Sequence, residues 1–164
     1  MKRVIVIGCP GSGKSTFSRA LHDLTGLPLF HLDMMYWNDD RTRVDRDVFY
    51  DKLQDVLATD EWIIDGDYIS TMELRMKRAD TIIFLDYSLE ICLQGARARV
   101  GQVRSDMPWV EVEKEVDSEF ITRINNYNSE KRPIVIGLLN KYSDKTVVIL
   151  KSRAQADEFI KNNL

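Results

Sequence analysis

Residues 8–15 read Gly-Cys-Pro-Gly-Ser-Gly-Lys-Ser and match the pattern G-x-x-x-x-G-K-[ST] at every fixed position. Glycines let such a loop turn tightly, so that its N–H groups and the start of the next helix form an anion site. Lys14 is then placed to reach the β- and γ-phosphates of a nucleoside triphosphate, and the Ser15 hydroxyl to coordinate Mg²⁺. The loop therefore predicts binding of ATP or a close relative. Its expected binding residues are Gly8, Pro10, Gly11, Ser12, Gly13, Lys14, Ser15 and Thr16, the last at the α-phosphate.

Carboxylates follow two further apolar runs. Asp65 ends the run 62–64 and fits the carboxylate that holds the water shell of the metal, although a strand-end cap is the alternative. Asp33 ends another run, and we expect it to accept a proton from an acceptor hydroxyl or to orient the acceptor, with a purely structural role as the alternative. Gly66 leaves room for a substrate beside Asp65, and Asp67 is a weaker candidate for contact with that substrate.

Arginines close to these segments could stabilise the charge that develops during phosphoryl transfer. Arg97, Arg99 and Arg104 flank a polar stretch, and a lid is expected near residues 98–115. We expect Arg97 and Arg99 to act on the nucleotide phosphates, and Arg75 to hold an anionic group of the acceptor. A solvated charged face is the alternative for the lid arginines.

Five short apolar runs alternate with segments of helical character, which predicts a parallel sheet covered on both faces. The expected architecture is a three-layer α/β/α sandwich in one domain, residues 1–164, with the candidate residues at the edge where the strands end. The predicted strands are 4–7, 29–32, 62–64, 81–85 and 146–150. The predicted helices are 14–25, 45–57, 88–103, 108–142 with a restart at Pro133, and 152–162.

Composition limits the classes of function. The chain of 164 residues has 23 Lys and Arg against 26 Asp and Glu, a net charge of −3, which disfavours nucleic acid as the main partner. No apolar run approaches the roughly 18 residues of a membrane span, and the first run is too short for a secretory signal. Cys9 and Cys92 have no metal-type spacing and are expected to be reduced thiols. The expected location is the cytoplasm, and the oligomeric state is left open.

Taken together, the motifs resemble those of a family related to adenylate kinases, the P-loop proteins known as DNA topology modulation proteins. The likeness covers nearly the whole chain. It rests on residues 8–16, His31-Leu32-Asp33 with Trp37 following, Ile63 to Tyr68, Arg78 to Asp86, and the pair Arg97 and Arg99.

The resemblance implies an adenylate-kinase-like fold with strand order 2-3-1-4-5, binding of ATP and Mg²⁺, and phosphoryl transfer. It also implies that residues 151–154, with Arg153, lie near the adenine, and it places Trp37 beside the acceptor. True adenylate kinases carry Asp-Gly-Phe-Pro-Arg after the third strand, where this chain has residues 65–69, Asp-Gly-Asp-Tyr-Ile. AMP is therefore not the expected acceptor.

Two functions are compatible with these residues. The leading one is a kinase that transfers the γ-phosphoryl group of ATP to a small molecule, with a nucleotide or nucleoside favoured over a sugar or an acid. The alternative is a regulatory or DNA-topology-related protein that uses ATP binding as a switch, in which case a basic surface and salt-sensitive DNA binding are expected.

Overall fold

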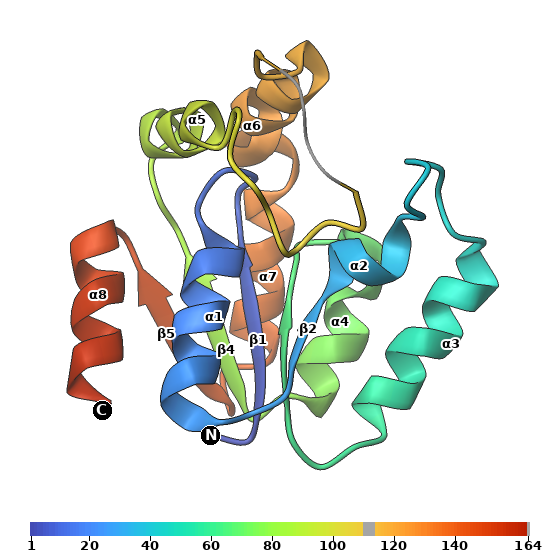
Figure 1. Cartoon of the computed structure of the whole chain (residues 1–164). Helices are drawn as coiled ribbons and strands as arrows, with labels where there is room; N and C mark the ends of the chain where they lie inside the picture. The colour runs from blue at the N-terminus through green and yellow to red at the C-terminus, as the bar shows by residue number, and fades with distance from the viewer. Residues whose placement is uncertain (110–113, 164) are drawn as a thin grey trace.

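The computed structural model describes residues 1–109 and 114–163 of the chain. Within them, a five-stranded parallel sheet has the order β2-β3-β1-β4-β5 (Figure 1). The first strand is central and pairs with β3 on one side and β4 on the other. Both the parallel sheet and its order are therefore confirmed. The strands are β1 (Arg3–Gly8), β2 (Leu29–His31), β3 (Trp62–Asp65), β4 (Thr81–Leu85) and β5 (Thr146–Leu150).

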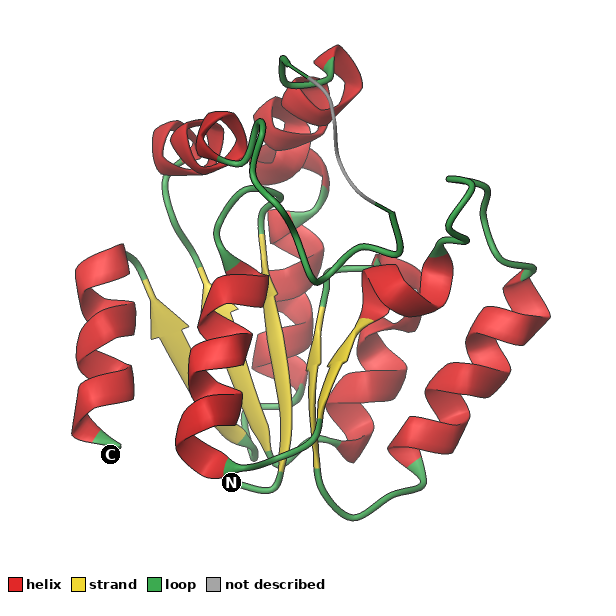
Figure 2. Cartoon of the chain, in the orientation of Figure 1, coloured by secondary structure: helices red, strands yellow, loops and turns green. Residues whose placement is uncertain are grey.

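Helices cover both faces of the sheet, which gives the expected three layers (Figure 2). In Figure 1, α1 and α8 lie in front of the sheet and α4 and α7 behind it, while α5 and α6 lie beyond the ends of the strands. The helices are α1 (Lys14–Thr25), α2 (Leu32–Tyr36), α3 (Arg46–Leu57), α4 (Ile69–Arg78), α5 (Leu89–Ala98), α6 (Ser118–Glu130), α7 (Arg132–Lys141) and α8 (Arg153–Asn162). None of the helices in the described ranges is long and apolar enough to cross a membrane.

Several helix ends follow local chemistry. Gly26 ends α1 in the left-handed conformation, with φ of 70°. Ser88 and Ser152 cap α5 and α8 by accepting hydrogen bonds from backbone amides of the first turn. Pro133 stands in the first turn of α7, so the predicted start of a new helix at this proline is confirmed.

Several elements of the structure differ from the prediction. No helix was predicted at α4, although its buried Met72 and Met76 have helical spacing. Helix α5 ends at Ala98 rather than near 103, and α6 begins at Ser118 rather than directly after Pro108. Asp33 lies in the first turn of α2 and not at the end of a strand. Of the expected lid, residues 110–113 lie outside the described residues.

Asp80 anchors the start of the central strand. Its carboxylate accepts hydrogen bonds from the backbone amides of Lys2 (3.0 Å) and Arg3 (2.9 Å) and from the Thr81 hydroxyl (2.7 Å). Burial raises the pKa of Asp80, but these donors more than offset it, so the pKa lies below its usual value. The ionised carboxylate therefore stabilises the fold.

Replacing Asp80 with alanine should lower the free energy of unfolding by about 1–3 kcal/mol, because the donors lose a charged acceptor. Urea unfolding of the variant against the wild type at pH 7 measures this loss. A folded-state pKa below that of the unfolded chain means that the stabilisation is present above roughly pH 4 and fades at lower pH. The difference between the two proteins should fade in parallel. The exposed Asp60→Ala variant is the control, and an equal loss there would contradict the assignment.

Candidate active site

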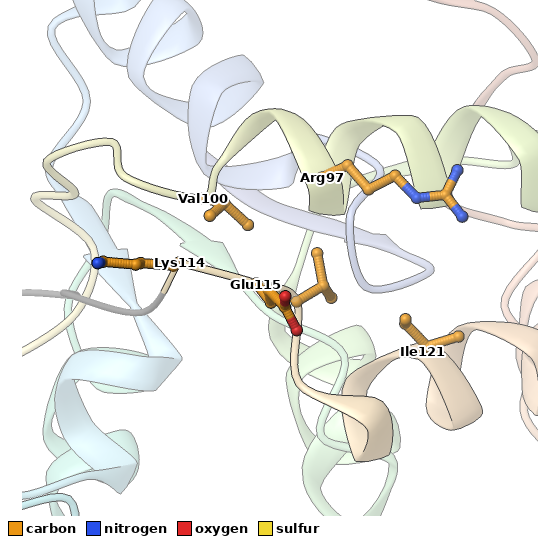
Figure 3. Close-up of a pocket in the computed structure, with 6 residues that line it drawn as sticks. Arg97, Val100, Lys114, Glu115 and Ile121 are labelled. Atoms are coloured by element: carbon orange, nitrogen blue, oxygen red, sulfur yellow. The ribbon is translucent and has the colours of Figure 1, made fainter.

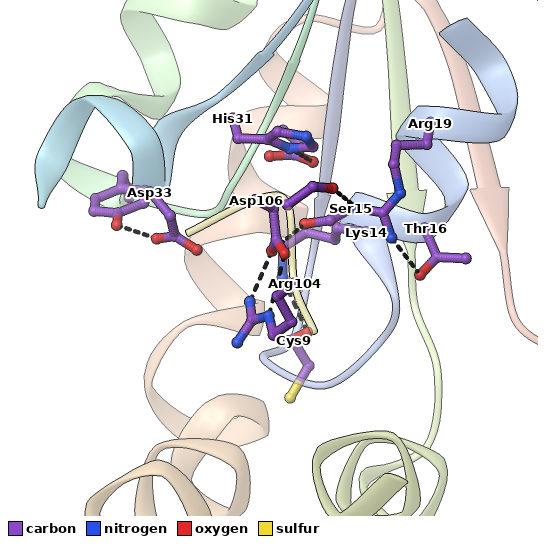
Figure 4. A network of polar contacts seen from close by, with 12 residues as sticks. Cys9, Lys14, Ser15, Thr16, Arg19, His31, Asp33, Arg104 and Asp106 are labelled. Atoms are coloured by element: carbon purple, nitrogen blue, oxygen red, sulfur yellow. Dashed lines mark hydrogen bonds and ion pairs between the residues drawn. The ribbon is translucent and has the colours of Figure 1, made fainter. Parts of the chain in front are cut away.

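The phosphate-binding loop joins the end of β1 to the start of α1. Gly11 in its middle has φ of 80°, a left-handed conformation that favours glycine. The Lys14 ammonium lies inside the loop and donates to the carbonyl oxygens of Gly8 (2.7 Å) and Cys9 (3.1 Å) (Figure 4). Ser12 is buried, and its Oγ has no hydrogen-bond partner among the described residues. A loop with a buried unsatisfied hydroxyl and an inward lysine suits a phosphate chain, so the residues fit the expected nucleotide.

Helix α5 packs directly on this loop through a second glycine. A Cβ added to Gly95 would lie 2.0 Å from the carbonyl oxygen of Gly11, and a Cβ on Gly11 would lie 2.2 Å from that of Cys92. Backbone therefore meets backbone at this point, and no side chain fits between them. Gly95 was not among the predicted site residues, although an isolated glycine within a helical pattern is a signal for such contact.

The two cysteines meet at the same contact. Cys9 and Cys92 are buried free thiols that lie next to each other, one from the loop and one from α5. Both side chains thus contribute to the packing of α5 on the phosphate-binding loop.

Asp65 ends β3 beside the central strand, opposite Val6, and is buried. Its Oδ2 lies 2.7 Å from Nδ1 of His31, the last residue of β2. Burial lowers the pKa of His31. The hydrogen bond and the charge of Asp65 together raise it by more than burial lowers it, so the pKa lies above its usual value. His31, interpreted above only through its motif, is therefore the direct partner of the predicted metal carboxylate.

The segment that was predicted to be a lid contacts the phosphate-binding loop through a carboxylate that was not predicted. Ser15 Oγ donates to Asp106 Oδ2 at 2.9 Å, and Asp106 is only 3% exposed (Figure 4). Arg104 holds the same carboxylate with two hydrogen bonds, Nε to Oδ1 at 3.1 Å and Nη2 to Oδ2 at 2.7 Å. Arg19 of α1 approaches Ser105 between them at 3.5 Å. The spacing Arg-x-Asp was visible in the sequence, but nothing there indicated its docking on Ser15.

Two of the three predicted lid arginines, Arg97 and Arg99, lie elsewhere. Arg97 is exposed on α5 and lines an open hollow of about 570 Å³, with Val100, Lys114, Glu115, Val116 and Ile121 (Figure 3). The Arg99 guanidinium lies 4.9 Å from the ring centroid of Phe120 on α6. The expected contact of Arg97 and Arg99 with phosphates stays a prediction, and it is Arg104 that the structure joins to Ser15, through the carboxylate of Asp106.

On the acceptor side, Asp33 and Tyr68 face each other, and the Tyr68 hydroxyl donates to the Asp33 carboxylate. Burial raises the pKa of Asp33, more than the Tyr68 hydrogen bond and the nearby Lys14 charge lower it. A carboxylate with a raised pKa is a better proton acceptor. The role of Asp33 towards an acceptor hydroxyl stays a prediction. Asp67 accepts the backbone N–H of Gly8 at 2.9 Å, so in this structure it contacts the phosphate-binding loop.

Arg75 requires a correction. It is fully buried, and its guanidinium donates to the carbonyl oxygens of Gly66 (2.8 Å), Asp67 and Tyr68. Burial lowers the pKa of Arg75 to about 10, so it stays charged at neutral pH. The expected direct contact with an acceptor anion is therefore wrong for this structure: Arg75 holds the loop after β3, because the carbonyl groups of that loop need an internal donor.

Aromatic rings connect the acceptor side to the lid. Trp37 packs edge-on against Trp109 with centroids 5.9 Å apart, and the Arg41 guanidinium lies 5.5 Å from the Trp109 ring. Tyr36 in turn contacts both Trp37 and Tyr68. Trp37 was predicted to contact the acceptor. It lies between α2, the helix that contains Asp33, and Trp109 of the predicted lid segment.

Arg153 begins α8 and reaches back to α5, where its Nη2 lies 3.5 Å from the Ile91 carbonyl oxygen. It also lies close to Gly95. The predicted contact of Arg153 with adenine stays a prediction, and the structure places this side chain next to the helix that supports the phosphate-binding loop.

The oxygen atoms of this site suit Mg²⁺. Ser15 supplies a hydroxyl, while Asp65 and Asp106 supply carboxylates, the hard ligands that the ion prefers. No set of three or more His, Cys, Asp or Glu residues in the described ranges is placed to hold a metal by itself. This arrangement fits an ion bound through one or two protein oxygens and the phosphates of its nucleotide.

The chain has the fold of known P-loop kinases. It is similar to the shikimate kinase of Bacteroides thetaiotaomicron, with a TM-score of 0.59 and 16% identity over 98% of this chain and 95% of that one. For a shikimate kinase of Acinetobacter baumannii in complex with shikimate, the TM-score is 0.63 and the identity 13%, over 99% of this chain and 90% of that one. For the shikimate kinase of Aquifex aeolicus, the TM-score is 0.59 and the identity 19%, over 98% of this chain and 92% of that one. At these identities the likeness establishes the fold. No protein-family model and no curated protein sequence matches.

Proposed function

We propose that this protein is a kinase that transfers the γ-phosphoryl group of ATP, with Mg²⁺, to a small-molecule acceptor. One observation carries the proposal. A complete phosphate-binding loop, the base candidate Asp33 and the lid pair Arg104 and Asp106 converge at one edge of a P-loop kinase fold. A loop that only stores nucleotide needs neither a buried carboxylate with a raised pKa nor an arginine brought in by a lid.

Each residue has a role in this reaction. Lys14 binds the β- and γ-phosphates, and Arg104 brings positive charge near the transferred group. Asp33 accepts the proton of the attacking hydroxyl, its carboxylate oriented by Tyr68. Ser15 and Asp65 would hold Mg²⁺, which neutralises phosphate charge when bound. Burial by the lid keeps water from competing with the acceptor.

The acceptor is proposed to be a nucleoside or nucleotide. Support comes from the rings of Tyr36, Trp37, Tyr68 and Trp109 around the acceptor side, since aromatic faces stack on bases. The resemblance to DNA topology modulation proteins, close relatives of the nucleotide-phosphorylating adenylate kinases, supports the same class. The segment after β3 lacks the adenylate kinase arginine, so AMP is not favoured.

Release of ADP in the presence of single added acceptors tests the proposal. The panel contains nucleosides, nucleoside monophosphates, shikimate, and hydroxylated sugars and acids, each with Mg²⁺ and ATP. One acceptor should stimulate ADP release well above the background hydrolysis of ATP, and mass spectrometry should find that acceptor heavier by one phosphoryl group. Absence of stimulation by every acceptor, together with salt-sensitive DNA binding that follows the bound nucleotide, would support the regulatory alternative instead.

The Asp33→Asn variant separates the acceptor chemistry from nucleotide binding. Turnover with the best acceptor should fall by about 10²- to 10⁴-fold, the usual contribution of a general base, while the Kd for ADP stays within twofold of the wild type. Asparagine keeps the size and still accepts the Tyr68 hydrogen bond, so the fold is preserved. An unchanged turnover would exclude Asp33 as the proton acceptor.

A further inference from the structure

The lid residue Asp106 has a contact that the proposed function does not require by itself. It is an almost fully buried carboxylate, although Ser105 beside it and residues 101–103 of the same loop are exposed. Its partner is the hydroxyl of Ser15, the P-loop residue expected at the metal, at 2.9 Å. A buried charge in a loop is costly unless it is paired, so this placement demands a partner for its charge.

Arg104 is that partner. Its guanidinium binds the carboxylate through both Nε and Nη2, and the pair is shielded from water, with 12% of the Arg104 side chain and 5% of the Asp106 side chain exposed. Two parallel hydrogen bonds fix the orientation of a carboxylate as well as its position. Oδ2 is therefore held at Ser15 by a rigid unit of the lid.

The direction of the hydrogen bond matters for the metal. A serine hydroxyl has one proton to donate and two lone pairs to offer. When the proton is donated to Asp106, as here, both lone pairs stay available to a cation. A hydroxyl without this acceptor rotates freely and can direct its proton toward the ion. Asp106 thus fixes Ser15 in the orientation that a metal ligand needs.

We propose that Asp106 is a positioning residue of the Mg²⁺ site, carried by the lid, so that Ser15 is set to bind the metal only when the lid is docked on the phosphate-binding loop. The inference rests on the proposed function, because it concerns the metal of that nucleotide. The predicted carboxylate Asp65 contacts His31 at this site, and Asp106 is the carboxylate that contacts Ser15.

The test measures the Mg²⁺ enhancement, the ratio of the Kd for ADP without Mg²⁺ to that with Mg²⁺, by calorimetry. Asp106→Ala should reduce this ratio by about tenfold while leaving the Kd without Mg²⁺ within twofold, since only the orientation of the metal ligand is lost. Asp106→Asn keeps an oxygen that accepts a hydrogen bond from Ser15, so its Mg²⁺ enhancement should be larger than that of Asp106→Ala. In the Ser15→Ala background, Asp106→Ala should have no further effect, because the hydroxyl that it orients is already absent. Val103→Ala, which alters a 90% exposed side chain of the same loop, is the matched control.

Each result decides the matter. An unchanged Mg²⁺ enhancement in Asp106→Ala would overturn the positioning role. An equal loss of ADP affinity with and without Mg²⁺ would overturn it as well. Tighter ADP binding in the variant would overturn it too, because the carboxylate would then be a competitor for the loop. A wild type without any Mg²⁺ enhancement would refute the proposed function itself, whereas a normal wild type with a normal variant refutes only the role of Asp106.

Discussion

Replacing Lys14 with alanine should lower acceptor-dependent ADP formation by at least about 100-fold, the loss that follows removal of one preorganised donor from a charged transition state. The ammonium already lies inside the loop, held by the carbonyl oxygens of Gly8 and Cys9. A phosphate chain that enters the loop therefore meets a cation whose position needs little rearrangement. Steady-state turnover with saturating ATP and the best acceptor measures the effect.

The exposed Lys52→Ala variant on α3 removes the same charge far from the loop and should keep full turnover. The melting temperature of Lys14→Ala should stay within a few degrees of the wild type, because the lost hydrogen bonds are only partly buried. Turnover of the Lys14 variant within threefold of the wild type would contradict the assignment of the loop to phosphate binding.

Gly95→Ala should both destabilise the fold and weaken nucleotide binding. The new methyl group would lie 2.0 Å from the Gly11 carbonyl oxygen, which is backbone and cannot rotate away. Overpacking of this kind costs about 1–3 kcal/mol, more than the roughly 1 kcal/mol that alanine gains over glycine in a helix. Displacement of α5 also distorts the loop, so the Kd for ADP should rise by about tenfold or more, the equivalent of about 1.4 kcal/mol.

Gly137→Ala is the matched control for this substitution. Gly137 also lies within a helix, α7, but a Cβ added there meets no atom within 4 Å. The variant should therefore be as stable as the wild type or slightly more stable, with unchanged ADP affinity. Thermal unfolding and calorimetry of both variants give the comparison. Equal behaviour of the two would mean that α5 moves away from the loop without cost.

The sheet could be predicted from the sequence because its strands are short, continuous and apolar, as in 4–7 and 81–85, and each ends at a turn or a carboxylate. The strand order came from the resemblance, since periodicity does not say which strands are neighbours. Helix α4 escaped prediction because its buried face includes Arg75, a residue type that sequence patterns assign to the surface.

The nucleotide end of the site could be predicted in more detail than the rest, for a related reason. The phosphate-binding loop is contiguous, so its chemistry can be read from adjacent residues, whereas the other contacts join residues far apart in the chain. Asp106 and Ser15 are 91 positions apart and His31 and Asp65 are 34 apart. Nothing local to Asp106 distinguishes it from a solvated loop aspartate, and only the fold reveals its partner.

The central position of β1 has a consequence for synthesis on the ribosome. Of the five strands it is made first, yet its neighbour β3 is made only after α1 to α3, and its other neighbour, β4, only after α4. Until β4 and then α5 emerge, Gly11 lacks the backbone surface that supports it. A nascent chain that ends before α5 should not retain nucleotide. The apolar run 4–7 has no neighbouring strand until β3 emerges, and its second edge stays unpaired until β4 emerges. Such a delay is when newly made chains of non-local topology most need chaperones.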